Sequence, residues 1–406
     1  MNSNVTFIKT RKYKDVNLYL RFSWRTTPEL RARAFLLSKM MGEATTIHKT
    51  KESMQRVKDM LYGISIDTAC KTRCDVSSYD IHYSFINPRF VNEPIENYCS
   101  FIEETLNNTL ISSKTLKEAK RSIISTLKRE NDKPSFYAKQ KVTEIASEEY
   151  PTMENQRLTG RILKDVENTS LKDVRDFYRF LFNECRLHVY LTGDVDNDTV
   201  EILTSYPFGN DNEVKIRLPE KVYKNKGEIV EKKKQPQSIY AKLFQSPFDK
   251  KSEDFYAFKL GNYFLGMAPC SLLFEEVREK RSLCYSIAAI DYSYYGMVKV
   301  VTSIDADKKD IVSEQIDEQI RRLVDKDYDL RKLEMAKALF LNMLDSLSDD
   351  GDGYIDFLYE NLISDFDPDI EAYKKKIIAV TADDISRIFK EYRPYFSYMM
   401  EGVLNG

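Results

Sequence analysis

The nitrogen and sulfur ligands that this chain offers to a transition metal are three histidines and six cysteines. The histidines His48, His82 and His188 are far apart in sequence and form no helical ligand pair. Cys70 and Cys74 are near one another but lack the second cysteine or histidine pair of a structural zinc site. We therefore predict no metal and no cofactor, and we expect reduced thiols instead of disulfides because six cysteines are few in so long a chain.

Nucleophilic catalysis and phosphate binding also lack a motif. Ser271 and Ser286 have no sequence context that would place them in a catalytic triad. The 13 glycines form neither a G-x-G-x-x-G pattern nor a P-loop. An enzyme that uses such chemistry is the function class that the sequence favours least.

Arg278 and Tyr285 stand at the expected end of a helix and the expected start of a strand. A guanidinium and a phenol both donate hydrogen bonds, so the pair could hold a carbonyl and stabilise the oxyanion that forms when water attacks it. Neither group activates water. Taken alone, the residues favour a simpler interpretation, in which Arg278 belongs to an exposed charged helix face and Tyr285 packs a strand.

The elements that position these side chains can be predicted from hydrophobic spacing. The stretch from Thr6 to Phe22 indicates a strand, and Thr26-Thr27-Pro28-Glu29 indicates the start of a helix that runs to about Met41. Further helices are predicted over residues 52–62, 95–110, 115–129 and 170–182, with another helical stretch that follows residue 129 and runs to about Ser147. Further strands are predicted over residues 79–85 and 187–192.

The second half of the chain repeats the landmarks of the first half in the same order. Ser170-x-x-Asp173 recurs 211 residues later as Thr381-x-x-Asp384, and Ala119-Lys120 recurs as Ala336-Lys337. The passage over residues 61–66 recurs over residues 283–288. Three pairs in order indicate two similar structural units.

The repeat gives the domain organisation. We predict one domain over residues 1–216, a connector over the lysine-rich stretch 217–236, and a second domain over residues 237–406. Strand runs and long helices are kept apart within each half, which indicates an α+β fold of two homologous domains. Each domain is expected to have an antiparallel-type sheet with helices on one face.

Composition argues against several partners. The 62 basic and 64 acidic residues nearly balance, so no net field favours nucleic acid or an anionic membrane. No run reaches the ~20 apolar residues of a membrane span, and residues 1–10 lack the apolar segment of a signal peptide. We therefore expect a cytoplasmic protein that binds neither nucleic acid nor membrane.

Two segments of the second half resemble a known family. Gly261-Asn262-Tyr263-Phe264-Leu265-Gly266, followed by residues 271–286, is similar to the second-half signature of pitrilysin and insulinase-like zinc peptidases. The first half agrees through Leu61-Tyr62-Gly63 and Asp132-Lys133-Pro134. The resemblance covers nearly the whole chain and implies two similar α+β domains that form half of a clamshell chamber.

The catalytic motif of that family is missing here. Active members carry an inverted zinc motif, H-x-x-E-H, on the first helix. The corresponding residues are Phe35-Leu36-Leu37-Ser38-Lys39, and the third ligand position falls near Leu127. These side chains supply neither the ligands of a catalytic zinc nor a base for its water. The resemblance therefore implies an inactive member that does not cut peptides by itself.

The resemblance also gives Arg278 and Tyr285 a role, because in the family such a pair contacts peptide opposite the zinc. Loss of the zinc motif with retention of this pair resembles one subunit of the heterodimeric family members of bacteria. It implies a zinc-bearing homologue as partner and a peptide as substrate. The alternative is a structural or scaffold protein of the same fold with no role in peptide cleavage.

Overall fold

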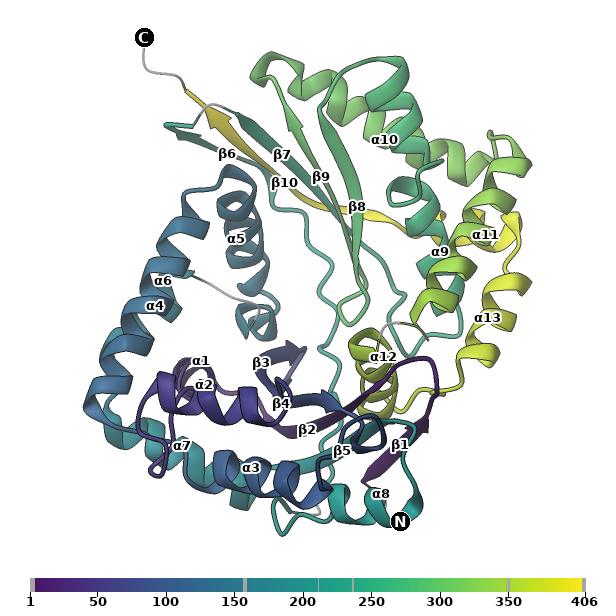
Figure 1. Cartoon of the computed structure of the whole chain (residues 1–406). Helices are drawn as coiled ribbons and strands as arrows, with labels where there is room; N and C mark the ends of the chain where they lie inside the picture. Colours follow the sequence, from purple (N-terminus) through teal and green to yellow (C-terminus); the bar gives the residue numbers. More distant parts are fainter. Residues whose placement is uncertain are drawn as a thin grey trace. The chain divides into compact units, whose positions relative to one another are not determined.

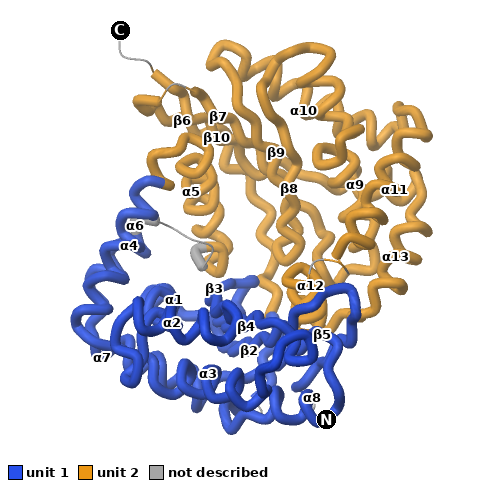
Figure 2. The backbone as a smooth tube through the Cα atoms, in the orientation of Figure 1, with its two compact units in different colours: residues 1–129, 155–216 blue, residues 130–154, 217–406 orange. Residues whose placement is uncertain are grey.

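The computed structural model describes residues 4–155, 159–210, 212–235, 237–347, 349 and 351–403. The chain divides into two compact units. One consists of Met1–Arg129 with Asn155–Ile216, and the other of Glu130–Glu154 with Arg217–Gly406 (Figure 2). Each unit contains one five-stranded sheet.

The sheet of the first unit has the order β1-β5-β2-β4-β3 (Figure 1). The central strands pair antiparallel, whereas β1 runs parallel to β5. The five strands are β1 (Val5–Lys9), β2 (Asp15–Arg25), β3 (Ser65–Arg73), β4 (Val76–Ile86) and β5 (Arg186–Gly193). The stretch predicted as one strand is therefore two, because β1 and β2 lie on opposite sides of β5 and the chain must turn between them.

The sheet of the second unit repeats this topology strand for strand, in the order β6-β10-β7-β9-β8. Its first strand, β6, again runs parallel to the last, β10, and the other pairs are antiparallel. The strands are β6 (Gly227–Lys233), β7 (Ser238–Gln245), β8 (Ser286–Tyr292), β9 (Met297–Ile304) and β10 (Arg393–Gly402). The prediction of an α+β fold with two homologous domains is confirmed.

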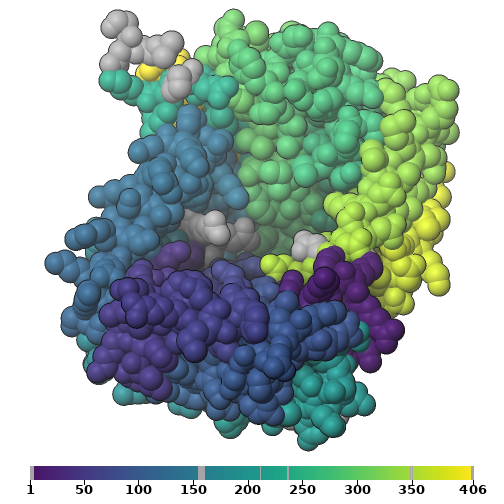
Figure 3. Space-filling view, in the orientation of Figure 1, coloured from purple at the N-terminus to yellow at the C-terminus, as the bar shows by residue number. Residues whose placement is uncertain are grey.

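Helices cover one face of the first sheet because its strands alternate apolar and polar side chains. Leu18, Leu20 and Phe22 of β2 lie in the core with these helices, whereas Tyr19 and Arg21 point to the other face. The helices are α1 (Pro28–Ser38), α2 (Lys51–Met60), α3 (Ile95–Asn107), α4 (Ser113–Asn131), α6 (Thr159–Asn168), α7 (Leu171–Glu184) and α8 (Asn197–Thr204). The surface of α2 and α3 is purple to blue in Figure 3.

The second unit has its own core between its sheet and its helices. Tyr240 and Phe244 of β7 and Met399 of β10 contribute to it. The helices are α9 (Phe255–Gly266), α10 (Lys309–Asp325), α11 (Leu330–Leu347), α12 (Gly351–Ile363), α13 (Ile370–Ala379) and α14 (Ala382–Lys390). In the described part of the chain, no helix is long and apolar enough to cross a membrane.

The repeated helix starts are capping boxes, as their sequences indicate. Ser170 caps α7, and its hydroxyl accepts a hydrogen bond from the backbone N–H of Asp173 at 3.2 Å. Thr381 caps α14 and accepts from the N–H of Asp384 at the same distance. In both, the aspartate carboxylate accepts a hydrogen bond from the backbone N–H of the cap residue. The two boxes therefore mark equivalent helices.

One helix from the first half of the sequence packs in the second unit. Helix α5 (Pro134–Ser147) contacts β7, and its buried side chains include the small residues Ala138 and Ala146. Tyr137 donates a hydrogen bond to Glu231 of β6 at 2.5 Å, and Tyr398 of β10 donates to the same carboxylate at 3.0 Å. Because Tyr398 alternates with the core residue Met399, α5 covers the sheet face opposite the other helices.

The segment predicted as a connector takes part in the same packing. Its residues 227–233 form β6, which extends the sheet by pairing with β10. Lys226 donates to the Ile145 carbonyl at 2.7 Å and pairs with Glu149 at 2.6 Å. Charged side chains thus join this stretch to the end of α5 through buried and half-buried ion pairs.

Candidate functional site

Arg278 and Tyr285 flank the passage from a helical turn to a strand. The segment η3 (Phe274–Lys280) is wound as a π-helix, a geometry that is frequent at functional sites. The turn is closed by a backbone hydrogen bond from Ser282 N to Arg278 O at 3.1 Å. Tyr285 then donates its N–H to the Ser303 carbonyl at 3.1 Å, one residue before β8 begins. The turn therefore fixes the backbone of Arg278, and the hydrogen bond to β9 fixes that of Tyr285.

The Arg278 guanidinium is only weakly paired. Its Nε is 3.7 Å from Glu279 Oε1, and its Cζ is 4.7 Å from the centre of the Phe274 ring. The side chain is 41% exposed. The preceding carboxylates have other partners: Glu275 pairs with Lys332, and Glu276 pairs with Lys280 and Arg322. Arg278 can therefore bind a ligand without breaking a strong ion pair.

Tyr285 does not pack into the core. Its side chain is 66% exposed, whereas the next residues facing the helices, Ile287 and Ala289, are buried. The interpretation that Tyr285 simply packs a strand is therefore wrong. Exposure leaves its phenol available to a ligand.

Strand β8 lies at the edge of the second sheet, since its neighbour in the sheet order is β9. Ser286 and Ile290 of β8 are exposed. An edge strand offers backbone N–H and C=O groups to an extended peptide, which can add as a further strand. The two exposed hydrogen-bond donors thus stand beside a backbone edge that suits peptide binding.

The position expected for a zinc motif falls at the end of α1. Leu36 and Leu37 are fully buried, and Phe35 is half-buried against the first core. Ser38 donates its hydroxyl to the Phe35 carbonyl at 2.8 Å, and Lys39 caps the helix at the surface. None of these side chains can donate the nitrogen or carboxylate electron pairs that zinc requires.

The three histidines lie in the first unit at separate places. His48 contacts the Glu104 carboxylate at 2.8 Å, and His82 stacks on Tyr19 with ring centres 4.0 Å apart. His188 lies on β5, where burial lowers its pKa to about 4, assisted by nearby cations of which Arg186 is the strongest. Across the described ranges, no group of three or more His, Cys, Asp or Glu side chains is placed to bind a metal ion.

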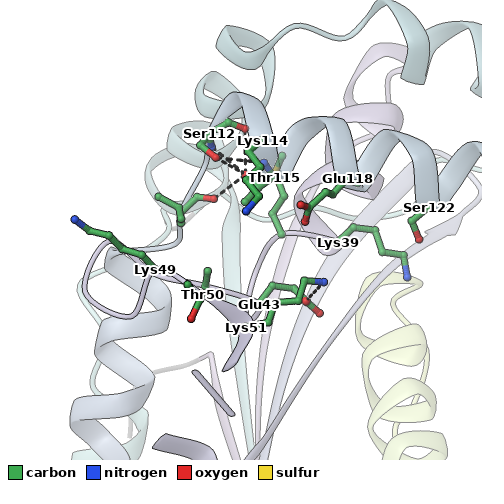
Figure 4. Close-up of a pocket in the computed structure, with 14 residues that line it drawn as sticks. Lys39, Glu43, Lys49, Thr50, Lys51, Ser112, Lys114, Thr115, Glu118 and Ser122 are labelled. Atoms are coloured by element: carbon green, nitrogen blue, oxygen red, sulfur yellow. Dashed lines mark hydrogen bonds and ion pairs between the residues drawn. The ribbon is translucent and has the colours of Figure 1, made fainter. Parts of the chain in front are cut away.

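A cavity of about 440 Å³ opens beside the end of α1 (Figure 4). Its wall is formed by Lys39 and the following loop, the start of α2, and the first turns of α4. Leu127, at the expected third ligand position, is instead half-buried against the first core. Sequence reasoning missed this cavity, because Lys39 and Lys114 are far apart in the chain.

A sequence profile described as the peptidase M16 inactive domain matches residues 168–340. The matched region contains both Arg278 and Tyr285. A sequence 21% identical over 409 residues is the probable inactive metalloprotease YmfF of Bacillus subtilis, with 98% of this chain and 95% of that protein covered. The chain is therefore similar to the M16 peptidases in its second half, and over nearly its whole length to a relative described as a probable inactive metalloprotease.

Solved structures share the fold of this chain. A conserved protein from Enterococcus faecalis superposes with a TM-score of 0.88 at 19% identity, covering 99% of this chain and 97% of that one. A peptidase M16 inactive domain from Pseudomonas fluorescens superposes with a TM-score of 0.75 at 14% identity, covering 98% and 96%. The predicted resemblance to the pitrilysin-type peptidases is confirmed.

Proposed function

We propose that this chain is a non-catalytic, peptide-binding subunit that works with a zinc-bearing M16 partner. The observation that carries the proposal is the contrast between two sites. The zinc position at Phe35–Lys39 has lost its ligands, whereas Arg278 and Tyr285 are exposed beside an edge strand.

The chemistry of the pair suits the binding of a peptide carbonyl. An arginine and a tyrosine donate hydrogen bonds to a carbonyl oxygen and bind it more strongly as negative charge develops there. The weak pairing of Arg278 with Glu279, at 3.7 Å, leaves its donors available. Because neither side chain activates water, cleavage needs a metal-bound water supplied by a second subunit.

Strand β8 would hold the peptide in register. Backbone hydrogen bonds along Ser286–Tyr292 give affinity that depends little on the peptide sequence. Tyr285 directly precedes this strand, so a peptide added along its edge passes the phenol. Substrate choice would then depend on the exposed side chains of β8, of which Ile290 is apolar and 38% exposed.

The proposal is tested with the purified chain, a zinc-bearing M16 homologue from the same genome, and a library of quenched fluorescent peptides. We expect cleavage by the mixture that exceeds the cleavage by either protein alone. Arg278→Ala should lower the rate of the mixture at least tenfold. Arg281→Ala is the matched control, because Arg281 is an exposed arginine three residues further along the chain.

The outcomes separate the proposal from its alternative. If the mixture cleaves equally well with Arg278→Ala and with Arg281→Ala, the chain is a scaffold with no part in the reaction. If the chain alone cleaves peptides with bound zinc, the non-catalytic assignment is overturned. A rate lost only with Arg278→Ala supports a peptide-facing role.

A further inference from the structure

We propose that the cavity beside α1 binds a small organic or inorganic anion that carries carboxylate or phosphate groups. We call this cavity the lysine cavity, since Lys39, Lys49, Lys51 and Lys114 line it. It lies beside Lys39, the last residue of the segment that corresponds to the zinc motif. The proposal does not depend on peptide cleavage.

The charges of the lysine cavity do not cancel. Its four lysines face two carboxylates, those of Glu43 and Glu118. Lys51 pairs with Glu43 at 2.5 Å, and Glu118 adds a weaker Coulombic attraction to Lys51. Among the described residues, Lys39, Lys49 and Lys114 have no carboxylate within ion-pair distance. Four lysines against two carboxylates leave an excess of positive charge, which favours an anionic ligand.

Two helices begin at this cavity and add to its positive potential. Helix α2 starts at Lys51 and helix α4 starts at Ser113. The N-terminal end of a helix carries partial positive charge, so cations are disfavoured there and anions are favoured. The first turn of α4 nevertheless holds Lys114 and no acidic residue. An anion bound in the cavity would relieve this repulsion.

The side chains are arranged around a hollow that suits a small molecule. Figure 4 shows Lys114, Glu118 and Ser122 along one side of α4, and Lys51 paired with Glu43 across from them. The Lys49 side chain extends outward at the rim (Figure 4). The volume of about 440 Å³ is within the range of small-molecule sites and exceeds the needs of a single monatomic ion.

The lining offers hydroxyl groups and an apolar floor besides the lysines. Thr50, Ser112 and Ser122 supply hydroxyls, and the buried residues Met40, Ala44 and Ala119 supply the apolar part. A ligand with two or more oxyanion groups on a compact body matches this combination. Pyrophosphate and citrate are probes of the two oxyanion chemistries.

The proposal is tested by isothermal titration of the full chain with inorganic pyrophosphate and, separately, with citrate at low ionic strength. We expect saturable binding with one site, weakened as salt rises. Lys114→Glu and Lys39→Glu should each lower the affinity at least tenfold. Lys117→Glu is the matched control, because Lys117 is exposed on α4 but does not line the cavity.

Each result has a defined meaning. Binding of pyrophosphate alone identifies a phosphate site, binding of citrate alone identifies a carboxylate site, and both support the shared chemistry. Absence of saturable binding overturns the proposal, as does equal weakening by Lys117→Glu, which would show nonspecific attraction. Lys114→Gln, which removes the charge without reversing it, keeps the test valid if a Glu variant fails to fold.

Discussion

The backbone N–H of Tyr285 donates to the carbonyl of Ser303 across 3.1 Å. This bond continues the β8–β9 ladder by one residue and holds Tyr285 at the sheet edge, with its side chain 66% exposed. Because the backbone of Tyr285 is already fixed, a ligand that binds the phenol needs to order only the side chain.

Tyr285→Phe should remove a hydrogen-bond donor without disturbing the fold, because the phenol is exposed. If Tyr285 stabilises an oxyanion in the mixed enzyme, kcat should fall by ~10²-fold with a smaller change in KM. The measurement is steady-state cleavage by the mixture. Tyr223→Phe, another exposed tyrosine, should leave both constants unchanged; an equal loss with that variant would refute a specific role for Tyr285.

Glu149 should make the second unit sensitive to acid. Burial alone would raise the pKa of this carboxyl, but hydrogen bonds from Lys226, Lys224 and Tyr395 outweigh it and lower the pKa to about 2. Because the folded pKa is depressed from 4.5, the stabilisation is complete above about pH 4.5 and is lost as pH falls toward 2. Glu149→Gln should cost ~1–3 kcal/mol at pH 7.

Denaturant unfolding of both proteins at pH 7, 4 and 2.5 checks this. The difference in free energy of unfolding between wild type and Glu149→Gln should become smaller as the pH falls. Glu148→Gln is the control, since the neighbouring Glu148 side chain is 69% exposed. If this difference in free energy of unfolding stays constant down to pH 2.5, the charge of the Glu149 carboxylate is not the source of the stabilisation.

Lys299 should make stability rise at alkaline pH. This residue of β9 is 3% exposed, its ammonium lies 5.4 Å from the Tyr292 ring centre, and burial lowers its pKa to about 8. The folded state therefore releases the proton at lower pH than the unfolded state does. The penalty for burying the charge is present below pH 8 and disappears as pH rises from 8 toward 10.5.

Lys299→Met should consequently stabilise the protein by ~1–3 kcal/mol at pH 7 and remove this rise. Thermal melts of both proteins from pH 7 to 10 measure the effect. Lys251→Met, an exposed lysine of the same unit, should retain the wild-type pH profile. A wild-type profile that falls or stays flat between pH 8 and 10, relative to Lys299→Met, would contradict the assignment.

The two capping boxes should contribute equally to the free energy of unfolding, because they have the same geometry in the two halves. Ser170→Ala and Thr381→Ala each remove the hydroxyl that accepts a hydrogen bond from a backbone N–H in the first turn of the helix. Each loss should lower the free energy of unfolding by ~1 kcal/mol. Chemical denaturation measures both. Ser125→Ala, at an exposed position inside α4, should be neutral or slightly stabilising. A cost below the experimental error for either cap variant would exclude its capping role.

Local sequence signals predicted the parts of the fold that depend on neighbouring residues. The capping boxes at Ser170 and Thr381 and the alternating strand β4 were all readable from short stretches. The parallel pairing of β1 with β5 was not, since its partners, such as Val5 and Val189, are far apart in sequence. The packing of α5 against β7 depends on the same kind of long-range contact.

Of the two candidate sites, one could be predicted from neighbouring residues and the other could not. Arg278 and Tyr285 are close in sequence, so their motif could be recognised as a unit. The lysine cavity joins Lys39 to Lys114 through the placement of α1 against α4, which no short pattern encodes. The exposed state of Tyr285 also required the structure, because the sequence around a tyrosine before a strand does not determine its burial.

The most direct test of the account is the zinc content of the purified chain, measured together with peptide cleavage by the chain alone and by its mixture with a zinc-bearing M16 homologue. We expect zinc far below one ion per chain, no cleavage by the chain alone, and cleavage by the mixture that depends on Arg278 and Tyr285. One zinc ion per chain with cleavage by the chain alone would contradict it.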